Sequence, residues 1–222
     1  MIVPKNAVGV NVPGMPKEVR VISYIDGFNL YFGLRDRGLR RYLWLDLKKL
    51  SIALLKPNQS LSMTKYFTSR IPGPSAKQQR QAIYLDALST IPQGEFRAHY
   101  GKFQETPRFC QNCGRTDLVP SEKMTDVNIA VEMLADAFQD RFDTALLISA
   151  DSDLCPAIRR IKALFPQKQV VVAFPPGRRS TELEKLAHAS FVIGKGRLSS
   201  SQLPDEITTS SGFVLKRPPS WI

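Results

Sequence analysis

The sequence has no apolar run of the roughly 18 residues that a membrane-spanning helix requires. Residues 1–18 also lack the charged start, apolar centre and small-residue cleavage site of a secretory signal peptide. The chain has only three cysteines, an odd number that does not suit a framework of paired disulfides. These absences argue against a membrane protein and against a disulfide-built secreted domain. We therefore expect a cytoplasmic protein without a membrane partner.

The chain also has fewer acidic than basic residues. The 20 Asp and Glu stand against 31 Lys and Arg, which gives a net charge of +11. The region from Leu154 to the C-terminus holds 11 Lys and Arg against 4 Asp and Glu. A basic excess of this size is typical of proteins with an anionic partner, most often a nucleic acid, although some ordinary soluble proteins share it.

At 222 residues, the chain fits a single α/β domain that can bury its core without disulfides. We expect residues 1–18 to form a flexible lead-in, residues 19–196 the domain, and residues 197–222 an irregular, basic, Ser- and Pro-rich tail. Strands alternate with helices through the domain, which predicts a three-layer α/β/α sandwich around a mostly parallel sheet.

The expected strands cover residues 19–25, 63–69, 96–103, 144–149, 169–174 and 190–193. The expected helices cover residues 28–38, 45–55, 75–90, 125–139, 154–165 and 180–187, with Ser75 and Thr125 as N-caps. Residues 104–122, which carry two cysteines, are expected to form an irregular loop.

Two of the expected strands end on acidic residues. The first ends on Asp26, with Asn29 three residues later, and another is followed at once by Asp151 and Asp153. Asp126 lies in the first turn of an expected helix. Ligands of open α/β sheets bind beyond the carboxyl ends of the strands, so we expect these side chains to meet at one edge.

Clustered carboxylates repel one another and raise one another's pKa values unless a cation is present. Mg²⁺ and Mn²⁺ favour oxygen ligands, and a bound metal activates water and stabilises charge on a phosphodiester. The pattern therefore predicts an Mg²⁺ or Mn²⁺ site for phosphate chemistry. The alternative to metal binding for Asp126 and Asp153 is that they cap helices. Asn29 either orients a water or a phosphate or is an ordinary turn residue.

Three ordered motifs resemble those of the NYN domain, a branch of the PIN-like nuclease superfamily. They are YIDGFNL at residues 24–30, EKMTDVNIAV at residues 122–131 and ISADSDL at residues 148–154. The resemblance runs from about residue 19 to residue 193. It implies a three-layer α/β/α fold and a metal-dependent ribonuclease, for which we expect cleavage within the RNA chain.

By this resemblance, the family's acidic positions fall on Asp26, Asp126, Asp151 and Asp153. Asn29 takes the family's polar position, and Lys123 takes a basic position at which we expect a phosphate contact. The chain departs from the family at Ala150 and at Met124-Thr125, where glycine is more common. Because PIN-like domains often pair, the resemblance also implies a homodimer.

The spacing of Cys110 and Cys113 is that of half a zinc site. His99 is a candidate third ligand, but a structural zinc needs four. A redox-sensitive pair and two unligated thiols are the alternatives to structural Zn²⁺. We expect Cys155, on an apolar helix, to be a buried packing residue.

The loop after the expected strand at residues 169–174 carries Arg178 and Arg179. It should reach the same edge as the acids, and we expect both arginines to contact RNA phosphates, with solvated charge as the alternative. Four aromatic residues near the first motif are expected in the core rather than as base-stacking platforms: Tyr24, Phe28, Tyr31 and Phe32.

Two other functions compete with the ribonuclease. One is a regulatory RNA-binding protein that retains a metal site without cleaving RNA. The other is a metal-dependent phosphatase, which would place an Asp-x-Asp pair directly after the first strand. The chain has Asp26-Gly27-Phe28 there instead.

Overall fold

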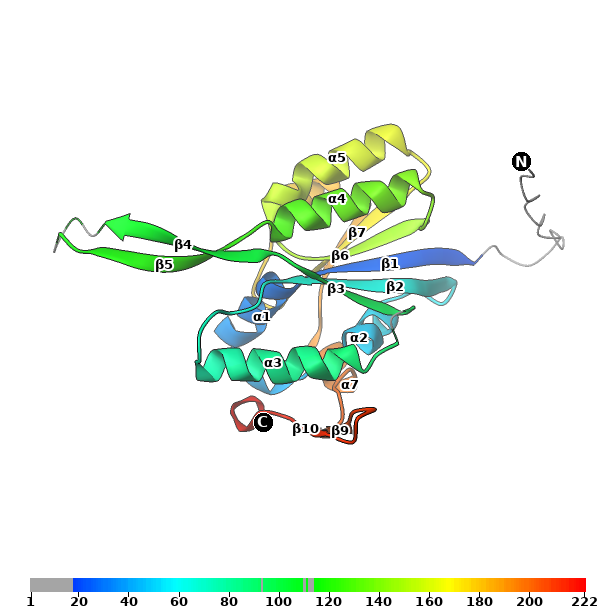
Figure 1. Ribbon diagram of the computed structural model, residues 1–222. Coiled ribbons are helices and arrows are strands. Elements are labelled where there is room, and N and C mark those ends of the chain that lie inside the picture. Colours follow the sequence, from blue (N-terminus) through cyan, green and yellow to red (C-terminus); the bar gives the residue numbers. More distant parts are fainter. Residues whose placement is uncertain (1–17, 93, 110, 112–113) are drawn as a thin grey trace, which may run out of the picture.

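The computed structural model describes residues 18–222, except residues 93, 110 and 112–113. Its centre is a parallel six-stranded sheet in the order β3-β2-β1-β6-β7-β8 (Figure 1). The strands are β1 (Val19–Asp26), β2 (Gln59–Thr68), β3 (Phe96–Tyr100), β6 (Thr144–Ile148), β7 (Gln169–Phe174) and β8 (Ala189–Val192). The predicted α/β class with a mostly parallel sheet is confirmed.

Helices cover both faces of this sheet. One face carries α1 (Gly27–Asp36), α2 (Leu47–Ala53), α3 (Ala76–Ser89) and α7 (Lys195–Ser200) (Figure 1). The other face carries α4 (Thr125–Phe138), α5 (Cys155–Leu164) and α6 (Thr181–Leu186), with a 3₁₀ turn at Ser152–Leu154. None of the described helices is long and apolar enough to cross a membrane.

The central strand β1 explains why there are two apolar cores. Val21 and Ile25 pack among the helices of the α1–α3 face, whereas Ile22 and Tyr24 pack among those of the α4–α6 face. Successive side chains of a strand point to opposite faces, so a strand covered on both sides must be apolar almost throughout. This continuous run is the pattern from which the sequence predicted a buried parallel strand.

A hairpin replaces the irregular loop expected at residues 104–122. Strands β4 (Lys102–Phe109) and β5 (Thr116–Lys123) pair antiparallel with each other and project from the body of the protein (Figure 1). The prediction was wrong because the hairpin forms a separate two-stranded sheet. It therefore lacks the core-facing apolar run by which the other strands were recognised.

The expectation of an irregular tail was also wrong. After α7, the tail forms β9 (Glu206–Thr208), β10 (Val214–Lys216) and a 3₁₀ turn at Pro219–Trp221. The ring of Trp221 is buried 5.8 Å from that of Tyr84 and 6.3 Å from that of Trp44. A few apolar anchors hold this segment on the α1–α3 face, which its Ser- and Pro-rich composition conceals. The expected lead-in, except for Glu18, lies outside the described residues.

Candidate functional site

The carboxyl ends of β1 and β6 bring the first and third motifs together. Asp26 is the last residue of β1 and is only 4% exposed. It caps α1, because its Oδ1 accepts a hydrogen bond from the backbone N–H of Asn29 at 2.9 Å. Its Oδ2 accepts from the Ser149 hydroxyl at 2.9 Å, and that hydroxyl oxygen accepts from the Asp151 N–H at 3.0 Å. One serine therefore links the two acidic strand ends.

Asp26 is difficult to ionise in this position. Burial raises the pKa of its carboxyl from 3.8 to about 6. The hydrogen bonds from Asn29 and Ser149 oppose this rise in pKa, and the negative charges of Asp151 and Glu122 add to it. The carboxyl therefore reaches half-ionisation only near pH 6.

Asp126 approaches the same point from the first turn of α4. Burial, together with the negative charges of Asp26, Asp151, Glu122 and Asp153, raises the pKa of its carboxyl from 3.8 to about 7. The structure therefore brings the four predicted acids within electrostatic reach of one another. The cluster holds more negative charge than its surroundings offset, so a proton or a cation is favoured there.

Glu122, at the end of β5, is a fifth acid that sequence analysis did not select. Its Oε1 accepts hydrogen bonds from the Thr125 backbone N–H at 3.0 Å, from the Thr125 hydroxyl, and from Ser69 Oγ at 3.3 Å. The expected N-cap at Thr125 was wrong: Thr125 is the first helical residue, and the N-cap is Met124. Met124 makes no side-chain cap, and Glu122 satisfies the free N–H instead. The sequence feature that could have identified Glu122 is its position three residues before the first residue of α4.

Asn29 is fixed across the sheet edge. Its Oδ1 accepts a hydrogen bond from the Ala150 backbone N–H at 3.1 Å. Within the described part of the chain its NH₂ group makes no hydrogen bond, so this group is free to donate to a ligand. Asn29 lines a polar pocket of about 300 Å³, the edge pocket, together with Gly33, Asp36, Ala150, Gly177, Arg178 and Arg179.

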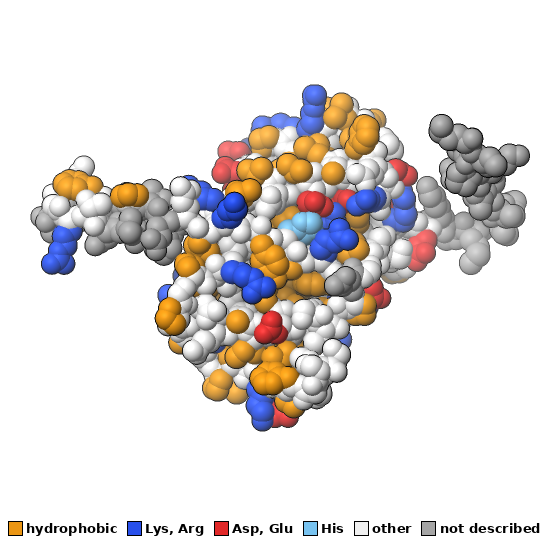
Figure 2. Space-filling model, in the orientation of Figure 1, with side chains coloured by type: hydrophobic (Ala, Val, Ile, Leu, Met, Phe, Trp, Pro, Cys, Tyr) orange, Lys and Arg blue, Asp and Glu red, His pale blue; other side chains and the backbone are white. Residues whose placement is uncertain are grey.

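The two predicted arginines reach this edge pocket but already have partners. Arg178 lies 3.2 Å from Asp36, and Arg179 forms two hydrogen bonds with Glu184. Exposed ion pairs of this kind contribute little to stability, so a phosphate can replace the carboxylate at little cost. Lys123 is exposed at the end of β5. Contacts of these three residues with RNA stay predictions. On the face shown in Figure 2, Lys and Arg are spread out rather than gathered in one patch.

The donor set suits a hard divalent cation, since all five acids offer carboxylate oxygens. As arranged, however, no group of three or more His, Cys, Asp or Glu side chains among the described residues converges closely enough to hold a metal ion. Binding would therefore require side-chain rotations or bridging waters. Mg²⁺ is suited to such a site because it usually keeps several of its waters.

The proposed zinc ligands are not brought together by any described contact. His99, on β3, stacks on the Phe67 ring with centroids 4.7 Å apart, and its Nδ1 lies 3.8 Å from Glu132. Cys110 and Cys113 lie outside the described residues. Cys155 is buried, as predicted for a packing residue.

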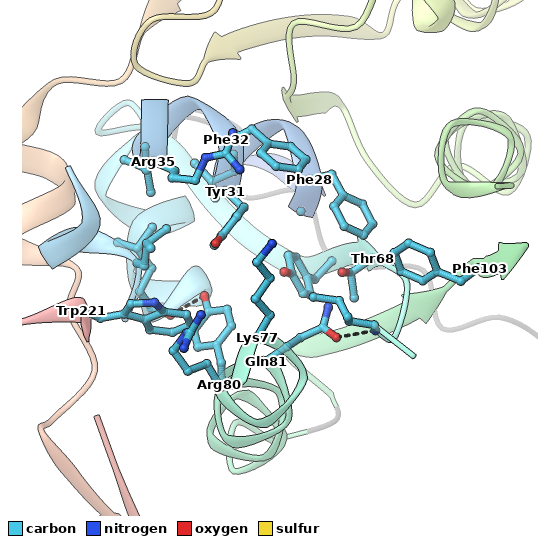
Figure 3. A pocket seen from close by; sticks show the side chains of 18 residues that line it. Phe28, Tyr31, Phe32, Arg35, Thr68, Lys77, Arg80, Gln81, Phe103 and Trp221 are labelled. Carbon is cyan, nitrogen blue, oxygen red and sulfur yellow. Dashed lines mark hydrogen bonds between the residues drawn. The ribbon is translucent and has the colours of Figure 1, made fainter. Parts of the chain in front are cut away.

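A second hollow, the α1–α3 cavity, lies beside the acids and has a volume of about 340 Å³ (Figure 3). The residues that give it its chemistry are Phe28, Tyr31, Lys77, Arg80, Phe103 and Trp221. The expectation that the aromatic residues near the first motif lie in the core is confirmed for Tyr24. Phe28, Tyr31 and Phe32 are half-buried and line this cavity, and Tyr31 also packs against the core of the α1–α3 face.

Comparisons with known proteins identify relatives of the chain and its family. The sequence is 28% identical over 242 aligned residues to 6-hydroxy-3-succinoylpyridine 3-monooxygenase HspA of Pseudomonas putida, covering 91% of this chain and 75% of that protein. A crystal structure of a protein of unknown function, VPA0982 from Vibrio parahaemolyticus, shares the fold with a TM-score of 0.53 and 18% identity, covering 86% of this chain and 99% of that one. The NYN domain family matches residues 20–194. The chain therefore belongs to the NYN domain family.

Proposed function

We propose that this protein is a metal-dependent ribonuclease that hydrolyses phosphodiester bonds within RNA chains. The observation that carries the proposal is the convergence of acids from three separate motifs, with the pKa of Asp26 raised to about 6 and that of Asp126 to about 7. Membership of a family that consists generally of ribonucleases supports the same reaction.

In this proposal, the carboxylates of Asp26, Asp126, Asp151 and Asp153 hold Mg²⁺ or Mn²⁺ directly or through waters. Such a metal, when bound, would lower the pKa of a water and offset negative charge on the phosphodiester. Glu122 adds negative charge to the cluster and fixes the start of α4.

The neutral and basic residues around the acids position the strand. Asn29 orients a water or a phosphate oxygen through its NH₂ group. Lys123, Arg178 and Arg179 contact phosphates on either side of the bond, which is consistent with the net charge of +11. Such contacts carry no sequence information, so the basic residues set affinity and orientation rather than the choice of base.

A cleavage assay tests the proposal. Single-stranded and structured RNAs, labelled at each end, are incubated with Mn²⁺, Mg²⁺ or EDTA and with three proteins: wild type, Asp151→Asn and Asp86→Asn. Asp86 is exposed on α3, so its variant has the same charge change away from the acids. We expect metal-dependent internal cuts in wild type and Asp86→Asn, and none in Asp151→Asn. RNA binding without cleavage in all three would identify a regulatory RNA-binding protein instead.

The relative from Pseudomonas putida favours a second candidate, an oxygenase of small aromatic acids. By its name, that relative acts on a hydroxypyridine that carries a succinoyl group. The α1–α3 cavity offers aromatic walls with Lys77 and Arg80 for such an acid. Monooxygenation consumes O₂ and two electrons, so substrate-dependent O₂ uptake with a nicotinamide donor tests this candidate. No uptake, together with RNA cleavage, would leave the ribonuclease.

A further inference from the structure

The α1–α3 cavity adjoins the acid cluster at two points. Gly27 lines it and directly follows Asp26 in the chain. Phe103 lines it from β4 and pairs across the hairpin with Glu122. A group bound in the cavity would therefore sit beside the acids, on the side of the sheet that carries α1 and α3.

Aromatic rings form one end of the cavity (Figure 3). The ring of Phe28 lies 6.0 Å from that of Phe103 in an edge-on arrangement and 6.2 Å from that of Phe32 in a stacked one. Phe28, Phe32 and Phe103 are half-buried rather than sealed in the core, and they offer ring faces to a ligand. Flat aromatic ligands bind to such walls by stacking.

Two cations from α3 line the same cavity, Lys77 toward its middle and Arg80 beside Trp221 (Figure 3). Lys77 and Arg80 are three residues apart on one face of the helix, and both side chains extend toward the cavity in Figure 3. Neither makes an ion pair or a side-chain hydrogen bond within the described part of the chain, whereas Lys48, on α2, is paired with Glu95 at 2.6 Å. No described acid lines the cavity. Its charge therefore favours an anion.

The wall beside these cations is rigid. The Gln81 Oε1 accepts a hydrogen bond from the Ile71 N–H at 2.8 Å, and its Nε2 donates to the Ser69 carbonyl at 2.9 Å. With both ends of its amide hydrogen-bonded, Gln81 holds the segment after β2 against α3. The cavity is thus already formed, and its volume of about 340 Å³ lies at the low end of the range of about 300–1,000 Å³ for small-molecule sites.

We propose that the α1–α3 cavity binds a planar aromatic ring that carries an anionic group, and that this ligand is one unpaired nucleotide of the RNA substrate. The base stacks on the Phe103 ring at the aromatic end of the cavity, and its phosphate lies toward Lys77 and Arg80. The assignment to RNA rests on the ribonuclease proposed above. Bases in a duplex are stacked on their neighbours, so the cavity selects single-stranded RNA or a loop.

Direct binding tests the cavity without any cleavage. Trp44 and Trp221 are the two tryptophans of the chain, and Trp221 lines the cavity, so intrinsic fluorescence reports on its contents. The titrations are done in EDTA with nucleoside 5′-monophosphates, with inorganic phosphate, and with nicotinate as a free aromatic acid. We expect saturable quenching by at least one nucleotide and none by phosphate at the same concentration.

Two variants and a control locate this binding. Lys77→Ala/Arg80→Ala should weaken nucleotide binding about tenfold or more, because charge-assisted hydrogen bonds are lost. Phe103→Leu should weaken it about tenfold through lost stacking, with no change in charge. Lys56→Ala/Arg97→Ala removes the same charge from exposed positions outside the cavity and should bind like wild type. Thermal melts confirm that each variant is folded.

Several results would overturn the proposal. Tighter binding of nicotinate than of any nucleotide would assign the cavity to free aromatic acids. Quenching by inorganic phosphate equal to that by a nucleotide would show that the base does not contribute to binding. Equal weakening of nucleotide binding in the Lys56→Ala/Arg97→Ala control would show that binding does not take place in this cavity. Because the titrations contain no metal, a protein that binds nucleotides here but never cuts RNA would contradict the ribonuclease and still support the cavity.

Discussion

The hydroxyl of Ser149 donates a hydrogen bond to Asp26 Oδ2 at 2.9 Å and thereby joins the end of β6 to the end of β1. Its oxygen also accepts the N–H of Asp151 at 3.0 Å. A neutral side chain thus connects two loops that carry acids. Its hydrogen bond also partly offsets the rise in the pKa of Asp26 that burial causes. Ser149 is a positioning residue, since it acts through Asp26.

Replacing Ser149 should change the titration of Asp26. The hydrogen bond from Ser149 lowers the pKa of Asp26, so Ser149→Ala should raise that pKa above about 6. We expect the acidic limb of the pH–rate profile for RNA cleavage to move to higher pH by up to about one unit. Ser152→Ala, at an exposed neighbouring position, should leave the profile unchanged. Identical profiles for wild type and Ser149→Ala would contradict this role.

Asp126 should make the metal-free protein less stable as the pH rises. Its pKa is about 7 in the folded protein and near 3.8 in the unfolded chain, so folding favours its protonated form. Its contribution to stability is therefore fully present below about pH 4 and is lost as the pH rises through 7. In EDTA at pH 8, Asp126→Asn should be more stable than wild type by about 1–2 kcal/mol, a figure discounted for partial exposure.

Thermal melts from pH 4 to pH 9 measure this difference. We expect the Tm of Asp126→Asn to exceed that of wild type by roughly 2–8 °C at pH 8 and to approach it near pH 4. Added Mn²⁺ or Mg²⁺ should raise the Tm of wild type more than that of the variant. A Tm difference that does not vary with pH would mean that Asp126 does not titrate in this range.

Lys65 should be far more important for stability than its surface counterparts. Its Nζ lies 2.6 Å from both Asp136 Oδ2 and Glu132 Oε2, with only 3% of the Lys65 side chain exposed. Lys65→Met leaves Asp136 buried with a weaker set of partners and should cost about 3 kcal/mol in urea unfolding. Lys48→Met breaks the more exposed pair with Glu95 and should cost less than about 1 kcal/mol. Equal costs for the two variants would contradict the buried network.

Replacing Met124 with glycine should increase the stability of the folded protein. Its φ is +79°, in the left-handed region, which costs a non-glycine residue about 1–2 kcal/mol. Met124→Gly should therefore stabilise the protein by up to about 1 kcal/mol, after allowing for the greater freedom of glycine in the unfolded chain. Met124→Ala keeps the Cβ and should show no gain in urea unfolding. Equal stabilities of the two variants would show that the turn is not strained.

The parts of the structure that sequence predicted are those that bury a regular face. The strand ending on Asp26 and the helix capped by Ser75 each have a local pattern with a single physical explanation. Sequence could not predict the β4–β5 hairpin, which pairs mainly with itself, or the tail, which depends on a few anchors such as Trp221. The helical spacing of apolar residues also places Phe28 on the inward face of its helix. That spacing cannot tell whether an inward side chain packs in the core or lines a cavity, as Phe28 does.

The docking of Trp221 has a consequence for the order in which the protein matures. The five acids all lie between Asp26 and Asp153, so they have been synthesised well before the last segment of the chain. The α1–α3 cavity lacks one wall until Trp221 settles beside Tyr84. A nascent chain, or one clipped by a protease before β9, would therefore carry the acids without the hollow next to them. On the ribosome, ligand selection would therefore arise later than the acid cluster.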